Sequence, residues 1–107
     1  MKLQVKEKEI QKQILDWLRL TKRFCWKNNT VGIYIQKTGH YIPNQSAGAP
    51  DIFVVICGQL IGIEVKSAIG KQSPDQVRWQ GNLEAAGGIY VLARSLDDVM
   101  EFFRNNL

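Results

Sequence analysis

Two acidic residues and a lysine lie at one end of two neighbouring apolar runs in the middle of the 107-residue chain. Asp51 precedes the run 52–57, and Glu64 and Lys66 close the run 60–66. Two carboxylates that lie close together can share a hard divalent cation, because such cations prefer oxygen ligands. A lysine beside them can hold or polarise a water molecule. These residue types therefore predict a metal site with a positioned water.

The pair Gly58-Gln59 separates the two runs, and glycine at the first central position suits a type II′ hairpin turn. With this turn, Asp51 would pair with Lys66, and Phe53 would pair with Glu64. Side chains alternate along a strand, so Asp51, Glu64 and Lys66 would project from one face. The Cα atoms of the two acids would be diagonal neighbours roughly 7–8 Å apart.

A structural ion pair between Asp51 and Lys66 is the competing interpretation of these residues. It would leave Glu64 unexplained, although a carboxylate among apolar strand residues is costly to desolvate unless it is paired or bound to a metal. We therefore favour the metal site.

The flanking elements follow from periodicity and turn residues. Apolar residues recur at three- and four-residue spacing over 5–23, which predicts an amphipathic helix carrying Ile10, Ile14, Trp17, Leu18 and Thr21. Aromatic and β-branched residues predict a strand around 31–36, and the Gly, Asn and Pro residues of 38–50 predict a loop. We expect 52–57 and 60–66 to form the hairpin.

The second half of the chain predicts two further helices around one strand. The quartet Ser73-Pro74-Asp75-Gln76 is typical of a helix start, and the helix would end at Gly87-Gly88. A strand is expected over 89–93, and Ser95 would cap a last helix. The order α-β-β-β-α-β-α predicts an α/β fold, with a mixed β-sheet flanked by helices.

Length, charge and cysteine content limit the class of protein. Residues 1–107 suit a single domain, and there is no apolar h-region or run of about 20 apolar residues, so we expect a cytoplasmic protein. The net charge is +4, and eight of the fourteen Lys and Arg lie between Lys2 and Lys27, which fits either a polyanionic partner or a solvated helix face. Cys25 and Cys57 are expected to be buried free thiols.

The central residues resemble a known nuclease signature. Pro50-Asp51, twelve intervening residues and then Glu64-Val65-Lys66 resemble the PD-(D/E)xK motif of metal-dependent nucleases. From Glu9 to about Asp98 the chain more narrowly resembles the VRR-NUC family, through Gly48-Ala49-Pro50-Asp51, Glu64-Val65-Lys66-Ser67, Gly70, Ser73 and Gln76. This resemblance implies a restriction-endonuclease-like core.

The resemblance also implies roles for individual residues. Asp51, Glu64 and the Val65 carbonyl would bind Mg²⁺ or Mn²⁺, and Lys66 would orient or activate the attacking water. An acid from the first helix would complete the site, with Glu9 as the first candidate and Glu7 as the second. Gln76 would belong to the active site, although its position three residues after Ser73 equally suits a helix cap.

DNA is the expected partner of a nuclease of this family. The resemblance implies a phage or bacterial endonuclease selective for branched DNA, such as four-way junctions or flaps, and two symmetric cuts would require a homodimer. Lys37, Lys71 and Arg78 are candidate phosphate contacts. A non-catalytic DNA-binding module on a nuclease fold, an RNA-processing endonuclease and a purely structural domain are the alternatives. Trp17, Trp26 and Trp79 could stack on bases, but Trp17 fits core packing better.

Overall fold

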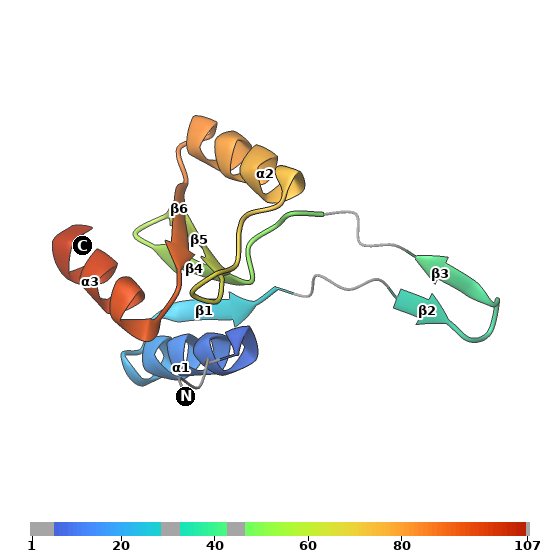
Figure 1. The fold of residues 1–107 in the computed structure, drawn as a ribbon, viewed down its shortest axis with the longest axis horizontal. Helices are drawn as coiled ribbons and strands as arrows, with labels where there is room; N and C mark the ends of the chain where they lie inside the picture. The colour runs from blue at the N-terminus through green and yellow to red at the C-terminus, as the bar shows by residue number, and fades with distance from the viewer. Residues whose placement is uncertain (1–5, 29–32, 43–46, 107) are drawn as a thin grey trace.

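The structure is a computed structural model that describes residues 6–28, 33–42 and 47–106. A four-stranded sheet forms its centre, and helices cover both faces of this sheet (Figure 1). The elements are α1 (Glu7–Leu20), β1 (Phe24–Lys27), β2 (Ile33–Ile35), β3 (His40–Ile42), β4 (Ile52–Ile56), β5 (Gln59–Val65), α2 (Pro74–Ala85), β6 (Ile89–Ala93) and α3 (Leu96–Asn106).

The central sheet has the strand order β1-β4-β5-β6 and is mixed. β1, β4 and β5 pair antiparallel, whereas β6 runs parallel to β5 because α2 forms the crossover between them. Along the chain the sheet and its helices follow the order α1, β1, β4, β5, α2, β6, α3. The predicted α/β class, the mixed sheet and the order of its elements are therefore confirmed.

The first strand of the sheet is not where the sequence predicted it. β1 occupies Phe24–Lys27, directly after the first helix, and pairs with β4. The predicted window 31–36 instead contains β2, which pairs only with β3 in a separate two-stranded sheet. Part of that window, residues 31–32, lies outside the described residues. β1 is only four residues long and is formed by a long-range pairing, which local composition does not reveal.

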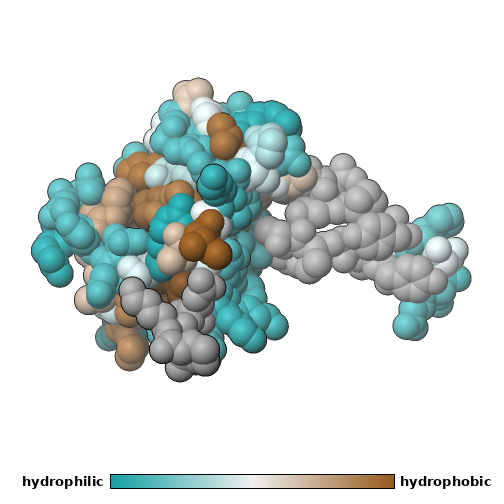
Figure 2. Space-filling view, in the orientation of Figure 1, coloured by the Kyte–Doolittle hydropathy of each residue, from teal (hydrophilic) through white to brown (hydrophobic). Residues whose placement is uncertain are grey.

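The segment 38–50, predicted to be a loop, contributes β3 to this hairpin. Residues 43–46 of the segment lie outside the described residues. The hairpin stands apart from the central sheet in Figure 1. The residues of its tip, Gln36 to His40, are all exposed, and Figure 2 shows this end of the molecule as mainly hydrophilic.

The main core lies between one face of the sheet and the helices α1 and α3. Every second residue of β4 and β5 points into it, including the fully buried Ile52, Val54, Ile61 and Ile63. Helix α1 contributes Ile10, Ile14, Leu15 and Leu18, and α3 contributes Val99 and Phe103. The helix α2 covers the other face, where Leu83 packs close to Gly62 and Gly88.

The β4–β5 hairpin turns one residue earlier than predicted. Ile56 pairs with Gln59, so the two turn residues are Cys57 and Gly58. Their φ angles of 50° and 79° are both positive, as a type I′ turn requires and a type II′ turn does not. Phe53 consequently lies opposite Gly62 and not opposite Glu64. Cys57 is exposed in this turn, which corrects its predicted burial, while both cysteines are free as expected.

The helix boundaries show how capping signals act. The N-cap of α2 at Ser73 and its end before Gly87 are confirmed, and Asp98 N donates to Ser95 Oγ at the start of α3. Helix α1 ends at Leu20, earlier than predicted, because Lys22 adopts a φ of 59° and Arg23 N donates to Leu18 O. Its predicted start at residue 5 lies outside the described residues.

Candidate active site

The carboxyl groups of Asp51 and Glu64 meet where β4 begins and β5 ends. Continuing the β4–β5 register by one residue places Asp51 directly opposite Glu64. The predicted pairing of Asp51 with Lys66 was therefore wrong, because the true partner lies two residues earlier on β5. Side chains alternate with a period of two, so Asp51, Glu64 and Lys66 still project from the same face of the sheet, as predicted. Asp51 Oδ2 also accepts a hydrogen bond of 2.8 Å from the backbone N–H of Val65. This bond fixes the first acid against the strand that carries the second.

Glu64 is the one buried charged residue among those that the structure describes, with 2% of its surface exposed. Burial, a side-chain hydrogen bond with Asp51 and the negative charge of Asp51 raise the pKa of Glu64 from 4.5 to about 9. The positive charge of Lys66 opposes this rise. Glu64 Oε1 is buried without a hydrogen-bond partner. Such an oxygen is costly unless something else binds it.

Lys66 follows β5 directly, and its backbone N–H donates to Ala93 O at 2.9 Å. The side chain is half-buried, strand alternation directs it to the face of Asp51 and Glu64, and its positive charge lowers the pKa of Glu64. The structure thus brings together the three residues singled out from the sequence. An ammonium group beside two carboxylates can hold a water molecule or a phosphate oxygen.

The acid that α1 brings to this site is Glu7. Its Oε1 accepts a hydrogen bond of 3.2 Å from Ser67 N, and its charge contributes to the raised pKa of Glu64. Glu9, the first candidate from the sequence, lies on another side of α1 and is exposed. The sequence did contain this signal, because Glu7 precedes the buried Ile10 and Ile14 by three and seven residues and so shares their helix face.

Arg94 is a site-adjacent residue that the sequence analysis missed. Its Nη1 donates to Ser67 O and to Gly70 O, the latter at 2.8 Å, so it closes the turn that follows Lys66. Arg94 comes directly after β6, and the parallel pairing of β6 with β5 brings it to the same sheet end as Lys66. A prediction that β5 and β6 pair in parallel would have identified Arg94, because it follows β6 as Lys66 follows β5.

Close backbone packing holds the segment that carries Asp51. A Cβ atom on Gly62 would lie 2.6 Å from Pro50 Cγ, so only glycine allows Pro50 to rest on β5. On Gly48, which has a φ of 90°, a Cβ atom would lie 2.4 Å from Asp75 O at the start of α2. Asn28 Nδ2 donates to Pro50 O from the end of β1. The residues before Asp51 are therefore fixed from three sides.

Comparison with known proteins supports this fold. No family model and no curated protein matches the sequence. Solved structures do match, among them one described as a VRR_NUC domain and another described as a VRR_NUC domain protein. The first has a TM-score of 0.72 over 94% of this chain and 97% of its own, and the second has 0.70 over 95% and 88%. Each is 19% identical to this chain.

The chain has the VRR_NUC fold. The resemblance noted in the sequence is thus confirmed at the level of the fold. On this fold the Asp51, Glu64 and Lys66 side chains occupy one end of the central sheet, and α1 and the turn 67–70 close it.

Gln76 forms a complete capping box in this VRR_NUC fold. Its Oε1 accepts from Ser73 N at 2.9 Å, and its own N–H donates to Ser73 Oγ at 3.2 Å. The side chain's Nε2 has no hydrogen bond within the part of the chain that the structure describes. The cap therefore uses the carbonyl end of the amide and leaves the donor end for another contact.

The three candidate phosphate contacts lie in different places. Lys71 follows the turn 67–70 and is exposed next to the site. Arg78 lies on α2 and forms an exposed ion pair with Asp75 at 3.0 Å. Lys37 lies in the tip of the β2–β3 hairpin, away from the sheet end that carries the acids (Figure 1). The structure therefore brings Lys71 to the site and does not bring Lys37 there.

The tryptophans divide between core and sheet face. Trp17 packs on Phe103 with ring centres 5.6 Å apart, as its place in the helical pattern predicted, and Arg23 lies over its ring. Trp26 and Trp79 each stack on Phe53, at 5.5 and 5.8 Å. His40 begins β3 and is exposed. No helix within the described ranges is long and apolar enough to cross a membrane.

The donor set of the site suits a hard cation. Among the described residues, no group of three or more His, Cys, Asp and Glu side chains is arranged to hold a metal ion, so side chains alone supply two ligands here. These two are the carboxylates of Asp51 and Glu64, which offer only oxygen. Because Glu64 Oε1 is buried without a partner beside a second acid, a divalent cation would satisfy both groups. The residues present therefore fit Mg²⁺ or Mn²⁺.

Proposed function

We propose that the protein is a Mg²⁺- or Mn²⁺-dependent nuclease that hydrolyses phosphodiester bonds of DNA. The observation that carries this proposal is the unpartnered, buried Oε1 of Glu64 beside Asp51, with Lys66 next to both. A buried acid with a raised pKa, as Glu64 is, is unfavourable for stability, and such groups cluster at functional sites. The VRR_NUC fold adds an independent reason to assign nuclease chemistry to this sheet end.

Each residue then has a defined task. Asp51, Glu64 and the Val65 carbonyl would hold the cation, which supplies positive charge to the scissile phosphate. Lys66 orients a water molecule and stabilises charge that develops on the phosphate oxygens. Glu7 positions the chain after Lys66 through its hydrogen bond with Ser67 N. Gln76 offers Nε2 to the substrate while its Oε1 caps α2.

The DNA is recognised through its backbone and shape. The part of the chain that the structure describes includes no helix-turn-helix and no zinc finger that would read bases in the major groove. We assign branched DNA, such as a flap or a four-way junction, as the preferred substrate. Because symmetric incision of two strands requires two active sites, the working form is a homodimer.

The test is cleavage of labelled duplex, single-stranded, flap and four-way-junction DNA, in Mg²⁺, Mn²⁺ or EDTA. We expect metal-dependent cutting that Lys66→Ala abolishes and that Lys22→Ala, an exposed cation in the turn after α1, retains. Sedimentation of the protein alone and with the junction reports the homodimer. Absence of cutting in either metal, with DNA binding intact, would replace this proposal by a non-catalytic DNA-binding module. If the protein cuts RNA in preference to DNA, the proposed substrate is wrong and the RNA-processing alternative takes its place.

A further inference from the structure

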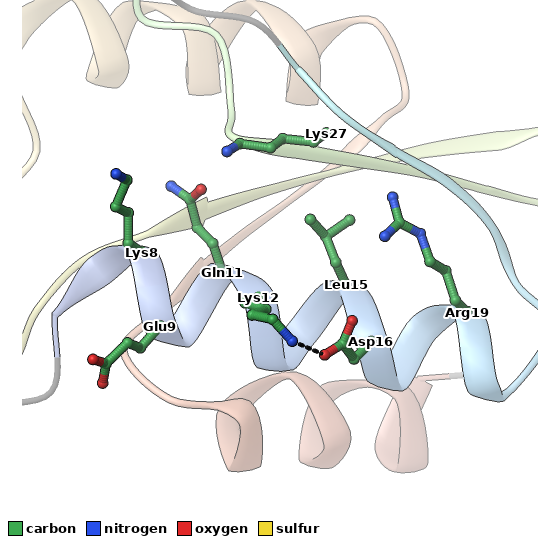
Figure 3. Close-up of a pocket in the computed structure, with 8 residues that line it drawn as sticks. All are labelled: Lys8, Glu9, Gln11, Lys12, Leu15, Asp16, Arg19 and Lys27. Atoms are coloured by element: carbon green, nitrogen blue, oxygen red, sulfur yellow. Dashed lines mark hydrogen bonds and ion pairs between the residues drawn. The ribbon is translucent and has the colours of Figure 1, made fainter.

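A groove lies between α1 and the end of β1, on a part of the surface that the acid site does not use (Figure 3). Its volume is about 460 Å³. Lys8, Gln11, Leu15 and Arg19 follow one face of the helix at spacings of three and four residues, and Lys27 of β1 faces them. We call these five residues the α1–β1 groove.

The groove carries a net positive charge, because four cations (Lys8, Lys12, Arg19 and Lys27) and two acids (Glu9 and Asp16) line it. Figure 3 shows Lys8, Gln11 and Arg19 directed to the side of α1 where Lys27 lies. The two acids at the rim do not offset them, because Glu9 points away and Asp16 is bound to Lys12 at 2.8 Å. Within the described residues, no ion pair involves Lys8, Arg19 or Lys27. Three cations and one amide therefore surround the largely buried Leu15.

Both walls of the groove connect to the acid site. On the helix side, Lys8 follows Glu7, which accepts the hydrogen bond from Ser67 N beside Lys66. On the strand side, Lys27 lies opposite Ile52, the residue after Asp51; because Ile52 and Asp51 point to opposite faces of the sheet, this path runs around the edge that β1 forms. A strand that leaves the site along this path would stay against cationic side chains for about 16 Å, the length of α1 from Lys8 to Arg19. Measured along the axis of a duplex, that length corresponds to about five nucleotide steps of one strand.

We propose that the α1–β1 groove binds the sugar-phosphate backbone of DNA that flanks the cleavage site. Lys8, Lys27 and Arg19 contact phosphates, and Gln11 donates to a phosphate or sugar oxygen. The choice of DNA as the occupant rests on the proposed nuclease function. The groove itself rests on the direction of the cations, on their excess over the two acids of its lining and on the neighbouring positions of Glu7 and Asp51.

The salt dependence of DNA binding tests this proposal without requiring cleavage. Each phosphate contact contributes about 0.9 to the slope of log K against log salt concentration. The double variant Lys8→Gln/Lys27→Gln should therefore lower the slope by about 1.8 and weaken binding about 60-fold at 0.1 M salt. Fluorescence anisotropy of a short labelled duplex in EDTA, titrated over about 50 to 200 mM salt, measures both quantities.

The control is Lys22→Gln/Arg104→Gln, which removes the same charge from exposed positions outside the groove. Thermal melting verifies that both double variants fold, as expected because all four side chains are exposed. A drop of the slope in the groove variant alone supports the proposal. Equal slopes in both variants, or no DNA binding by the wild type, overturn it.

The outcome is separable from that of the nuclease proposal. If the wild type cuts DNA and the slopes are equal, the groove proposal fails and the nuclease proposal stands. If the wild type cuts nothing while the groove variant alone loses slope, the groove is a DNA site and the nuclease proposal fails.

Discussion

Replacing Glu64 with glutamine should stabilise the metal-free protein, although Glu64 belongs to the proposed active site. The pKa of Glu64 rises from 4.5 in the unfolded chain to about 9 in the folded protein, chiefly because the carboxyl group is buried. Between these values the folded state holds one proton more than the unfolded state. The contribution of Glu64 to stability is therefore fully present below pH 4.5 and is lost as the pH rises to 9.

The size of the effect follows from the same two values. At pH 7 the loss is about 1.4 kcal/mol for each of two and a half pH units, or about 3.5 kcal/mol as an upper limit. Glu64→Gln has the shape of the protonated acid and takes up no proton on folding. Its free energy of unfolding should thus exceed that of the wild type by up to about 3.5 kcal/mol at pH 7 and equal it near pH 4.

Urea denaturation in EDTA at several pH values between 4 and 9 measures this difference, and Glu101→Gln, an exposed acid of α3, is the matched control. Adding Mn²⁺ should reverse the ranking at pH 7, because a ligand at about 1,000 times its Kd stabilises the folded state by about 4.1 kcal/mol and only the wild type has both carboxylates. If Glu64→Gln is less stable than the wild type in EDTA at every pH, the carboxyl is not buried beside Asp51 and the reasoning is refuted.

Three further substitutions distinguish residues that hold the site in place from a residue that would contact the substrate. Gly62→Ala should push Pro50 from β5, costing about 1–3 kcal/mol and lowering kcat, because Asp51 moves with it; unchanged cleavage rates would contradict the packing argument. Arg94→Gln removes the charged donor to Ser67 O and Gly70 O and should lower the free energy of unfolding by about 2–3 kcal/mol, with faster hydrogen exchange in the turn 67–70 as the specific readout. Gln76→Glu keeps the carbonyl acceptor of the capping box but removes Nε2, so the urea midpoint should stay constant while cleavage slows; equal cleavage would leave Gln76 with the cap alone.

The parts of the fold that local signals determine could be predicted from the sequence. Ser73 and Gln76 fix the start of α2 through bonds within four residues, and Gly87 ends this helix with a φ of 92°. The alternation of β4 and β5 placed Asp51 and Glu64 on one face even though the turn was one residue off. That error arose because Gly58 suits the first position of one turn type and the second of another.

The parts that depend on distant contacts could not be predicted. β1 exists as a strand because Phe24–Lys27 pair with β4, more than twenty residues away. Arg94 reaches the site only through the parallel neighbour relation of β5 and β6. The choice between Glu7 and Glu9 was different, since the stripe formed with Ile10 and Ile14 already favoured Glu7. The sequence therefore already indicated which acid shares the buried face of α1, but two acids in the first turn made the choice between them difficult.

The β2–β3 hairpin has a practical consequence for protein engineering. The chain leaves the central sheet at Asn28 and returns at Asp51, and Asn28 N donates to Asp51 O at 2.8 Å, so departure and return coincide. Residues inserted between Asn28 and Asp51 therefore leave the distance between these two ends of the segment unchanged, and a longer loop costs little extra closure entropy. The exposed turn 36–39 is consequently a natural place to insert a peptide tag or to attach a fluorophore, because it lies outside the β4–β5 hairpin and leaves the acid site unaltered.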